Sequence, residues 1–258
     1  MTLPPLDFVP ETGSTNADLM ARIAAGNPSE EGAWLIADRQ SAGRGRLGRT
    51  WHGGAGNFMG STLAHLRVDD PPAHSLALVM ALCVAAALDS AADGHAPPPH
   101  FQLKWPNDIM VDGAKIAGIL LERHGNHVVI GVGVNLVSAP QLDGRRTVAL
   151  ADLGITVARD DFALVLAQNV ATALARWRYG DWPERIIADW LERAHPVGTL
   201  LALTEGECAG ARGAFDGLNQ DGSLLLRRAD GSVTTIHAGE VRLSGSDEDE
   251  GTAHAAGD

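Results

Sequence analysis

The centre of the chain is a succession of short apolar segments that are separated by tight turns. Four of these segments follow one another with few residues between them, at 101–104, 108–111, 115–122 and 127–134. An Asp-Gly pair at 112–113 and the sequence HGNH at 124–127 are typical of hairpin turns. Hairpin turns join antiparallel strands, whereas parallel strands require a much longer crossover. This part of the chain therefore predicts an antiparallel sheet.

Helix and strand signals alternate on both sides of these hairpins. Thr15 followed by Asp18 resembles a capping box that opens a helix, and Gly26 is placed to end it. Apolar patterns predict further strands at 33–38 and 57–68. They also predict helices at 73–92, 160–179 and 183–195.

The pattern changes after residue 195. Residues 197–243 contain short strand-like runs separated by Gly and Asp turns, which predicts a small β-barrel or sandwich. We expect a main domain at 1–195 and a small β domain at 196–244. The last segment, 245–258, is acidic and poor in apolar residues, and we expect a disordered tail.

The composition limits the function classes. A hydrophobic content of 45% is typical of a globular protein with a core, and a net charge of −12 argues against general nucleic-acid affinity. Cys83 lies in the apolar run 75–88 and is expected to be a buried thiol rather than a partner of the distant Cys208. That run is too short to span a bilayer, and the N-terminus lacks a signal-peptide pattern. We expect a soluble, cytoplasmic protein.

Residues 43–51, the arginine loop, combine three glycines with Arg44, Arg46 and Arg49. The glycines satisfy the G-x-G-x-x-G pattern of dinucleotide-binding proteins, and an acidic pair at 69–70 follows at a suitable distance. That pattern also requires a helix after the loop, and the glycine-dense sequence that follows cannot start one. A ligand-free surface loop remains an alternative, but it would leave the like charges unneutralised. The composition favours an anion-binding loop.

The sequence KWPND at 104–108 is the second candidate for anion chemistry. Taken alone it could be an ordinary turn, since Pro fixes φ and Asn and Asp close turns. Lys104 and Lys115 lie on either side of Asp108, however, and lysine suits carboxylate or phosphate oxygens. Asp108 could hold Mg²⁺, which prefers one or two carboxylates together with substrate phosphates. Asn135 closes the strand VVIGVGVN, whose glycines permit close approach of a flat ring.

In combination, these motifs resemble the biotin protein ligase family. They occur in the family's order and at compatible spacing over residues 11 to about 243. The resemblance is carried by Ser14-Thr15-Asn16, Gln40, the arginine loop GRGRLGRTW, KWPNDI, K-x-x-G-I-L at 115–120 and GVGVN at 131–135. Leu47 and Thr50 stand where some relatives have basic residues, which lowers the positive charge of the loop.

The resemblance implies an α+β fold. It would have a mixed, mainly antiparallel central sheet flanked by helices, similar to class II synthetases, and a small SH3-like C-terminal β-barrel. Only about ten residues precede the first motif, so we expect a monofunctional form without the DNA-binding domain of the bifunctional relatives. A biotin-sensing transcription regulator is disfavoured for the same reason.

The resemblance also implies roles for individual residues. The catalytic residues would be Lys115, Arg46 and Arg44. Those around biotin would be Ser14, Thr15, Asn16, Gln40, Gly43, Arg44, Gly45, Arg46, Lys115 and Gly118. Those around ATP or the adenylate would be Arg49, Trp51, Asn107, Lys115 and Asn135. Asp108 would hold Mg²⁺.

The implied reaction uses ATP and biotin as substrates. It forms biotinyl-5′-AMP and transfers biotin to a lysine of a biotin carboxyl carrier domain of a carboxylase. No DNA or membrane partner is expected, and the enzyme would be a monomer or weak homodimer. A lipoate ligase or octanoyltransferase would share the fold, but the polar set at 14–16 with Gln40 suits a ureido ring better than a dithiolane.

Overall fold

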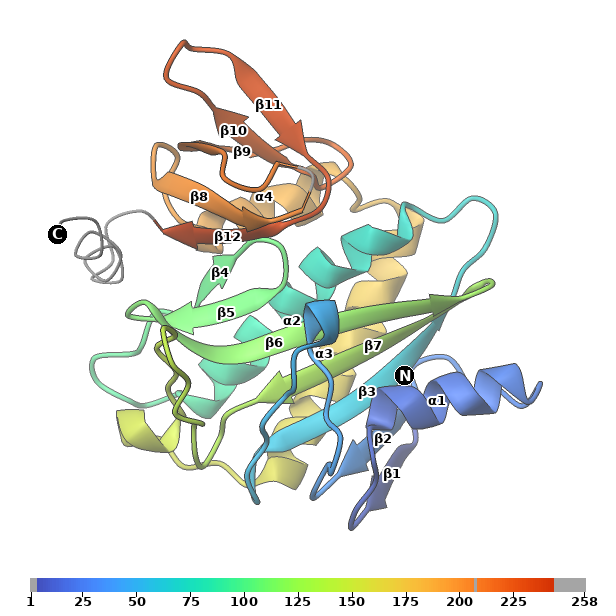
Figure 1. The fold of residues 1–258 in the computed structure, drawn as a ribbon. Helices are drawn as coiled ribbons and strands as arrows, with labels where there is room; N and C mark the ends of the chain where they lie inside the picture. Colours follow the sequence, from blue (N-terminus) through green and yellow to red (C-terminus); the bar gives the residue numbers. More distant parts are fainter. Residues whose placement is uncertain (1–3, 207, 244–258) are drawn as a thin grey trace, which may run out of the picture.

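A seven-stranded sheet in the order β1-β2-β3-β7-β6-β5-β4 forms the centre of the molecule in the computed structural model (Figure 1). The structure describes residues 4–206 and 208–243. β1 and β2 pair in parallel, and every other neighbouring pair is antiparallel. The prediction of a mixed, mainly antiparallel sheet is therefore confirmed. The strands are β1 (Leu6–Val9), β2 (Trp34–Ala37), β3 (Phe58–His65), β4 (Gln102–Lys104), β5 (Asp108–Val111), β6 (Ala114–His124) and β7 (His127–Val134).

The four predicted central strands form the antiparallel run β4 to β7. Asp112 and Gly113 connect β5 to β6 with φ values of 48° and 75°. Positive φ at both positions is the requirement of a type I′ hairpin turn, which explains the Asp-Gly pair. β7 pairs with β6 on one side and β3 on the other over its full length, so it is the central strand of the site described below.

The edge strand β1 was not predicted. Leu6–Val9 has four residues, and only its first and last are half-buried. It runs parallel to β2, with Leu6 opposite Trp34 and Val9 opposite Ala37. A short edge strand without a hairpin turn carries neither the alternation nor the turn residues on which a strand prediction depends.

Helices cover both faces of the sheet. On one face, α2 (Leu76–Ala91) and α3 (Arg159–Tyr179) pack on each other, and α4 (Glu184–Arg193) lies beside α2 and β4. Cys83 is buried in α2, where burial raises the pKa of its thiol to about 12. The helical segment Ala73–Ala91 has 19 residues, more than the predicted run, and is long and apolar enough to cross a membrane. It is 61% buried inside the protein, as expected of a core helix.

The helix α1 (Thr15–Ala24) lies on the opposite face, where Leu19 and Ile23 pack against the sheet. Its N-cap is Ser14, whose side chain accepts from the backbone N of Ala17, so the predicted cap at Thr15 was wrong by one residue. Asp18 binds the hydroxyl of Thr12 rather than completing a capping box. Gly26, with φ of 73°, follows the C-cap residue, as predicted.

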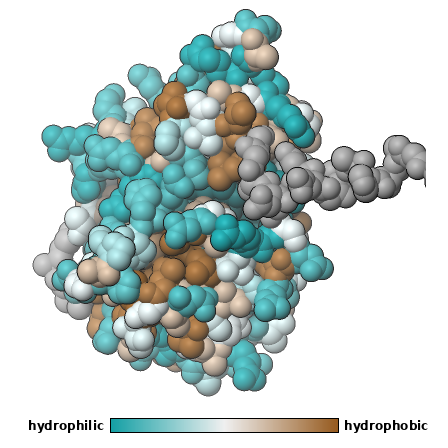
Figure 2. Space-filling view, turned by 90° about the vertical axis from the view of Figure 1, so that its left-hand side faces the viewer, coloured by the Kyte–Doolittle hydropathy of each residue, from teal (hydrophilic) through white to brown (hydrophobic). Residues whose placement is uncertain are grey.

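The C-terminal strands form a separate antiparallel, barrel-like sheet in the order β11-β10-β9-β8-β12. They are β8 (Leu200–Glu205), β9 (Arg212–Leu218), β10 (Leu224–Arg227), β11 (Val233–Ile236) and β12 (Glu240–Leu243). Figure 1 shows this sheet above β4 and β5. Figure 2, the face at the left of Figure 1, shows groups of hydrophobic residues in both its upper and its lower half, among hydrophilic ones.

The apolar core continues across the predicted domain boundary. Leu203 and Phe215 belong to the same buried cluster as Leu78 and Trp105. The indole N of Trp105 also donates to the carbonyl of Gly222 at 3.1 Å. The division at 195/196 stays a prediction, and the predicted tail at 245–258 lies outside the described residues.

Candidate active site

A cavity of about 320 Å³ lies on the α1 side of the sheet. Its walls come from the start of α1, the arginine loop, the strands β3, β6 and β7, the loop 140–147 and β12 of the C-terminal sheet. This volume is in the range of small-molecule sites. Every residue predicted to bind a ligand lines it, apart from Gly43.

Glycines make the floor of the cavity flat. A Cβ at Gly133 would lie 2.2 Å from the indole of Trp51, and one at Gly118 would lie 2.9 Å from Lys115 Nζ. At Gly131 it would lie 2.4 Å from Asn16 Oδ1. The glycines of the GVGVN motif do admit a flat ring, but in this structure the ring on Gly133 is that of Trp51.

One end of the cavity carries amide and hydroxyl groups. Gln40 Oε1 accepts from the backbone N of Thr15 at 2.8 Å, and Thr15 Oγ1 lies 2.6 Å from Ser61 Oγ. Ser61 Oγ donates to Asn16 Oδ1 at 2.6 Å. Thr15, Asn16 and Ser61 are buried, so each hydrogen bond is protected from water. This end suits a neutral ligand with both donors and acceptors.

Sequence reasoning missed Ser61 and Glu122 at this end. Glu122 accepts from Asn16 Nδ2 at 2.8 Å and lies 3.9 Å from Arg44. The alternation of β6 could have indicated it, because Glu122 follows Gly118 by four residues and so shares its face of the strand. Ser61 carried no comparable signal, since the run 57–68 contains no recognisable motif.

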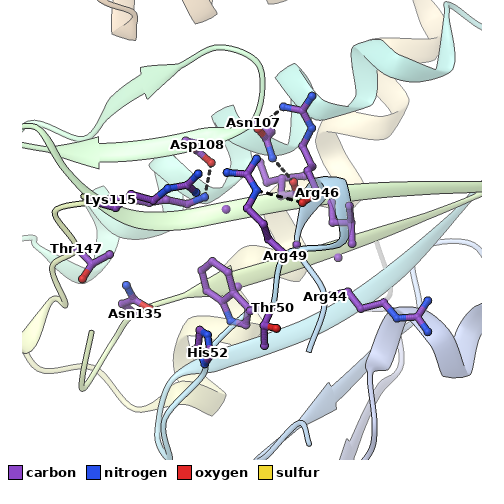
Figure 3. A pocket seen from close by; sticks show the side chains of 18 of the residues that line it. Arg44, Arg46, Arg49, Thr50, His52, Asn107, Asp108, Lys115, Asn135 and Thr147 are labelled. Carbon is purple, nitrogen blue, oxygen red and sulfur yellow. Dashed lines mark hydrogen bonds and ion pairs between the residues drawn. The ribbon is translucent and has the colours of Figure 1, made fainter. Parts of the chain in front are cut away.

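Arg44 of the arginine loop lies apart from Arg46 and Arg49, which lie together, with Arg49 Nε donating to the carbonyl of Arg46 at 3.3 Å. Residues 46–48 form one 3-10 turn. The next element after the loop is the strand β3 and not the helix that a dinucleotide-binding loop would need. Arg44 points away from Lys115 and Asp108 in Figure 3. Arg46 donates to Asn107 Oδ1 at 3.2 Å and to the carbonyl of Gly239 at 3.0 Å. The loop thus connects the polar end of the cavity to the C-terminal sheet.

Glu240 of β12 pairs with arginines from two loops that border the cavity. Arg49 NH1 donates to its Oε1 at 2.9 Å, and Arg145 lies 3.4 Å from the same carboxylate. Burial opposes the ionisation of Glu240, but the hydrogen bond and charge of Arg49 outweigh it and hold the pKa below its usual 4.5. This contact of the C-terminal sheet was not predicted, because no motif includes Glu240.

We expect Glu240→Gln to lower the free energy of unfolding by about 1–3 kcal/mol near neutral pH, because it removes a charge-assisted hydrogen bond. The folded pKa of Glu240 is depressed, so its stabilisation is present above the unfolded value of about 4.5 and is lost as the pH falls through the folded pKa. Urea denaturation of both proteins between about pH 7 and pH 3.5 measures this. If the difference in the free energy of unfolding between the two proteins stayed constant over this pH range, ionised Glu240 would not be the source of the stabilisation.

Asp108 is held between the two lysines. Lys115 Nζ lies 2.5 Å from Oδ1 (Figure 3). On the other side, Lys104 Nζ lies 3.5 Å from Oδ2. Burial opposes ionisation of Asp108, but the charges of Lys115 and Lys104 hold its pKa below the usual value. Lys115 also lies 5.8 Å from the centre of the Trp51 ring. The carboxylate therefore fixes the ammonium of Lys115 inside the cavity.

Asn135 supplies an acceptor without a partner. Its side-chain N donates to the carbonyl of Val148 at 3.2 Å, while its Oδ1 is buried and has no hydrogen-bond partner among the described residues. Residues 4–206 and 208–243 contain no group of three or more His, Cys, Asp or Glu side chains that could hold a metal ion. An amide oxygen and one carboxylate nevertheless fit Mg²⁺ that arrives with phosphates, because that ion takes few protein ligands.

Comparisons with known proteins agree with this arrangement. The sequence pattern of the biotin/lipoate A/B protein ligase family matches residues 14–135. Over 238 residues the chain is 35% identical to the biotin–[acetyl-CoA-carboxylase] ligase of Mycobacterium tuberculosis, spanning 92% of this chain and 88% of the relative. It is 36% identical over 250 residues to the ligase of that name from Paracoccus denitrificans, spanning 91% and 98%.

A solved structure extends the likeness to the fold. The biotin protein ligase of Aquifex aeolicus in complex with biotin and ATP superposes with a TM-score of 0.79. The two chains are 26% identical, and the match covers 93% of this chain and 99% of the other. The C-terminal sheet is thus part of the shared fold.

Proposed function

The chain belongs to the biotin protein ligase family, and we propose that it joins biotin to a lysine of a biotin carboxyl carrier domain at the expense of ATP. The carrier would belong to a biotin-dependent carboxylase, since both relatives named above are acetyl-CoA-carboxylase ligases. One observation carries the proposal. A single cavity joins a buried amide and hydroxyl end to an end that holds Lys115, Arg46 and Asn135.

The polar end would bind the ureido ring. A cyclic urea offers one carbonyl acceptor and two N–H donors, and the groups of Ser14, Thr15, Asn16 and Gln40 provide the opposite functions. The flat floor at Gly118 and Gly133 would carry the rest of the ligand, once Trp51 moves from Gly133. Trp51 would then cover the nucleotide.

In the first step, a carboxylate oxygen of biotin attacks the α-phosphorus of ATP, and the bond from that phosphorus to the bridging oxygen breaks. Pyrophosphate leaves and biotinyl-5′-AMP remains. Two anions approach each other, so the barrier is largely electrostatic. Lys115 would hold the carboxylate and α-phosphate oxygens, and Arg46 would stabilise the charge that builds on them. Arg44, which lies beside Glu122 in the structure, would join them when it leaves Glu122 as the arginine loop closes on the ligands.

Asp108 and Asn135 would hold Mg²⁺. When bound, the ion would neutralise phosphate charge as a Lewis acid. Lys115 would turn from Asp108 to the phosphate, which frees a carboxylate oxygen. Arg49 and Asn107 would complete the nucleotide end.

In the second step, the lysine amine of the carrier attacks the acyl carbon of the mixed anhydride, and AMP leaves. Neither step needs an enzyme nucleophile. Cys83 is buried in α2 and its raised pKa leaves it as a thiol, so it is unsuited to that role.

The test is pyrophosphate release from ATP with biotin, lipoate or octanoate as the acid, followed by transfer to a purified carrier domain. We expect release with biotin alone. Release with lipoate or octanoate instead would replace the proposal with the related ligase activity that the same family includes.

We expect Arg46→Gly to release biotinyl-5′-AMP into solution, because Arg46 ties the arginine loop to Asn107 and to the carbonyl of Gly239. The freed adenylate should biotinylate bystander proteins, which a streptavidin blot with added serum albumin detects. Arg39→Gly, an exposed loop position, is the matched control. If the Arg46 variant labels the carrier domain alone, the loop does not retain the adenylate.

A further inference from the structure

Glu122 lies at the polar end of the cavity and belongs to none of the motifs that indicate the function. Its two carboxylate oxygens have different partners. Oε2 accepts from Asn16 Nδ2 at 2.8 Å, and Oε1 lies 3.9 Å from a guanidinium nitrogen of Arg44. Glu122 therefore connects the start of α1 with the arginine loop, two segments that close the cavity from different sides.

The carboxylate sets the orientation of the Asn16 amide. An ionised carboxylate can only accept hydrogen bonds, so Asn16 must turn its nitrogen to Glu122 and its oxygen to Ser61. The hydroxyl proton of Ser61 is then used in the hydrogen bond to Asn16. In the hydrogen bond between Thr15 and Ser61, Thr15 must therefore be the donor. The hydrogen bonds run in one direction, from Thr15 through Ser61 and Asn16 to Glu122.

This direction matters for a ligand that has both donors and acceptors. With its nitrogen turned to Glu122, Asn16 keeps a second amide hydrogen for an acceptor such as a urea carbonyl. Asn16 is 3% exposed, and its amide lies against Gly131, where a Cβ would come within 2.4 Å of the amide oxygen. Position alone would allow the amide to flip, because its two ends are nearly equal in shape.

The second oxygen acts on the arginine loop. The side chain of Arg44 is 58% exposed and that of Glu122 is 27% exposed, so their attraction is weak and sensitive to salt. It nevertheless draws Arg44 to the end of the cavity that holds Asn16, away from Lys115 (Figure 3).

We propose that Glu122 is a positioning residue of the biotin site, which fixes the Asn16 amide and holds Arg44 of the arginine loop over it. This inference rests on the proposed function. It assigns to Glu122 a part in biotin affinity and no contact with ATP or with the reacting atoms.

Two substitutions separate the two contacts. Glu122→Met removes both contacts. Glu122→Ala removes the same two contacts with a different side chain. Glu122→Gln keeps a carbonyl oxygen that can accept from Asn16 but removes the charge that attracts Arg44. Isothermal titration gives the biotin Kd, and pyrophosphate release gives kcat and the KM for ATP.

We expect Glu122→Met to raise the biotin Kd about tenfold or more, because a buried hydrogen bond to a charged group is lost. Glu122→Gln should raise it by at most about fivefold at low salt. The KM for ATP and kcat at saturating biotin should stay within about twofold of the wild type, as for uniform binding. An unchanged biotin Kd in Glu122→Met, or an equal rise in the KM for ATP, would overturn the proposal.

A double-mutant cycle tests the contact with Arg44. Arg44→Gln should raise the biotin Kd less in the Glu122→Gln background than in the wild type, and the difference should vanish at high salt. Strictly additive effects at low salt would remove Arg44 from the proposal.

Glu192→Gln, an exposed carboxylate on α4, controls for the loss of one negative charge. The experiment distinguishes failure of the proposed function from failure of this inference. If the wild-type protein does not bind biotin, the proposed function is wrong. If it does and Glu122→Met binds biotin equally well, only this inference is wrong.

Discussion

Replacing Lys115 with alanine is expected to lower the rate of biotin-dependent pyrophosphate release by about 100- to 1000-fold, the effect of removing one preorganised charge from a transition state. Lys115 is held in the cavity by Asp108, 2.5 Å away, before any substrate arrives. The variant should keep its fold, because β6 and the bridge to Thr147 use only the backbone of this residue.

Lys104→Ala is the matched comparison for Lys115→Ala. Lys104 contacts the other oxygen of Asp108 at 3.5 Å and supports the turn at 104–108. Its removal should slow the reaction by less than about tenfold, since Lys115 keeps its partner. Thermal denaturation of both variants excludes unfolding as the cause. Near-normal pyrophosphate release by Lys115→Ala would refute the role given to it.

Arg178→Met is expected to lower the free energy of unfolding by about 3–5 kcal/mol. The Arg178 side chain is 6% exposed and lies near the end of α3. It donates to both oxygens of Glu31 at 2.9 and 3.0 Å, to Asp70 at 2.9 Å and to the carbonyl of His65 at 2.9 Å. Asp70 is itself buried, with a side chain that is 4% exposed. Substitution would therefore leave the buried Asp70 carboxylate and the partly exposed Glu31 carboxylate without this cation.

Chemical denaturation measures the loss, and Arg67→Met is the control. Arg67 is exposed and contacts Tyr179, so its substitution should cost less than about 1 kcal/mol. Replacing Glu31 with Gln and Asp70 with Asn in the Arg178→Met background should restore part of the stability. If the two single variants have the same free energy of unfolding, the ion pairs of Arg178 with Glu31 and Asp70 do not stabilise the packing of α3 on the sheet.

Much of the fold was predictable because its signals are local. The hairpins of β5 to β7 follow from alternating apolar residues and from an Asp-Gly turn that requires positive φ. The edge strand β1 escaped prediction because its pairing with β2 depends on a distant segment. The cap of α1 was misplaced by one residue because Ser14 and Thr15 have the same capping chemistry.

The candidate site was predictable where its residues belong to compact motifs. Lys115 and Asp108 come together because they lie on the paired strands β6 and β5, and Asn107 directly precedes β5. Glu240 was not predictable, because it acts through a contact with the distant Arg49. Strand alternation places Glu122 on the same face as Gly118, but its contact with Asn16 spans a long stretch of sequence and carries no local signal. The arginine loop suggested one cationic cluster, but Arg44 lies beside Glu122 while Arg49 pairs with Glu240, because these two carboxylates lie at opposite ends of the cavity.

The pairing of both lysines with Asp108 has a chemical consequence for the enzyme itself. Lys104 and Lys115 are the only lysines of the chain, and every other basic side chain apart from histidine is an arginine. An acyl adenylate reacts with amines, and a guanidinium stays protonated and unreactive. Apart from its amino terminus, the enzyme thus offers an escaping intermediate no exposed amine, because both lysines pair with the buried Asp108 before substrates bind. During the reaction Lys104 would stay on Asp108 and Lys115 would be held by the phosphate. A ligase of this composition would remain unlabelled while it modifies its partner.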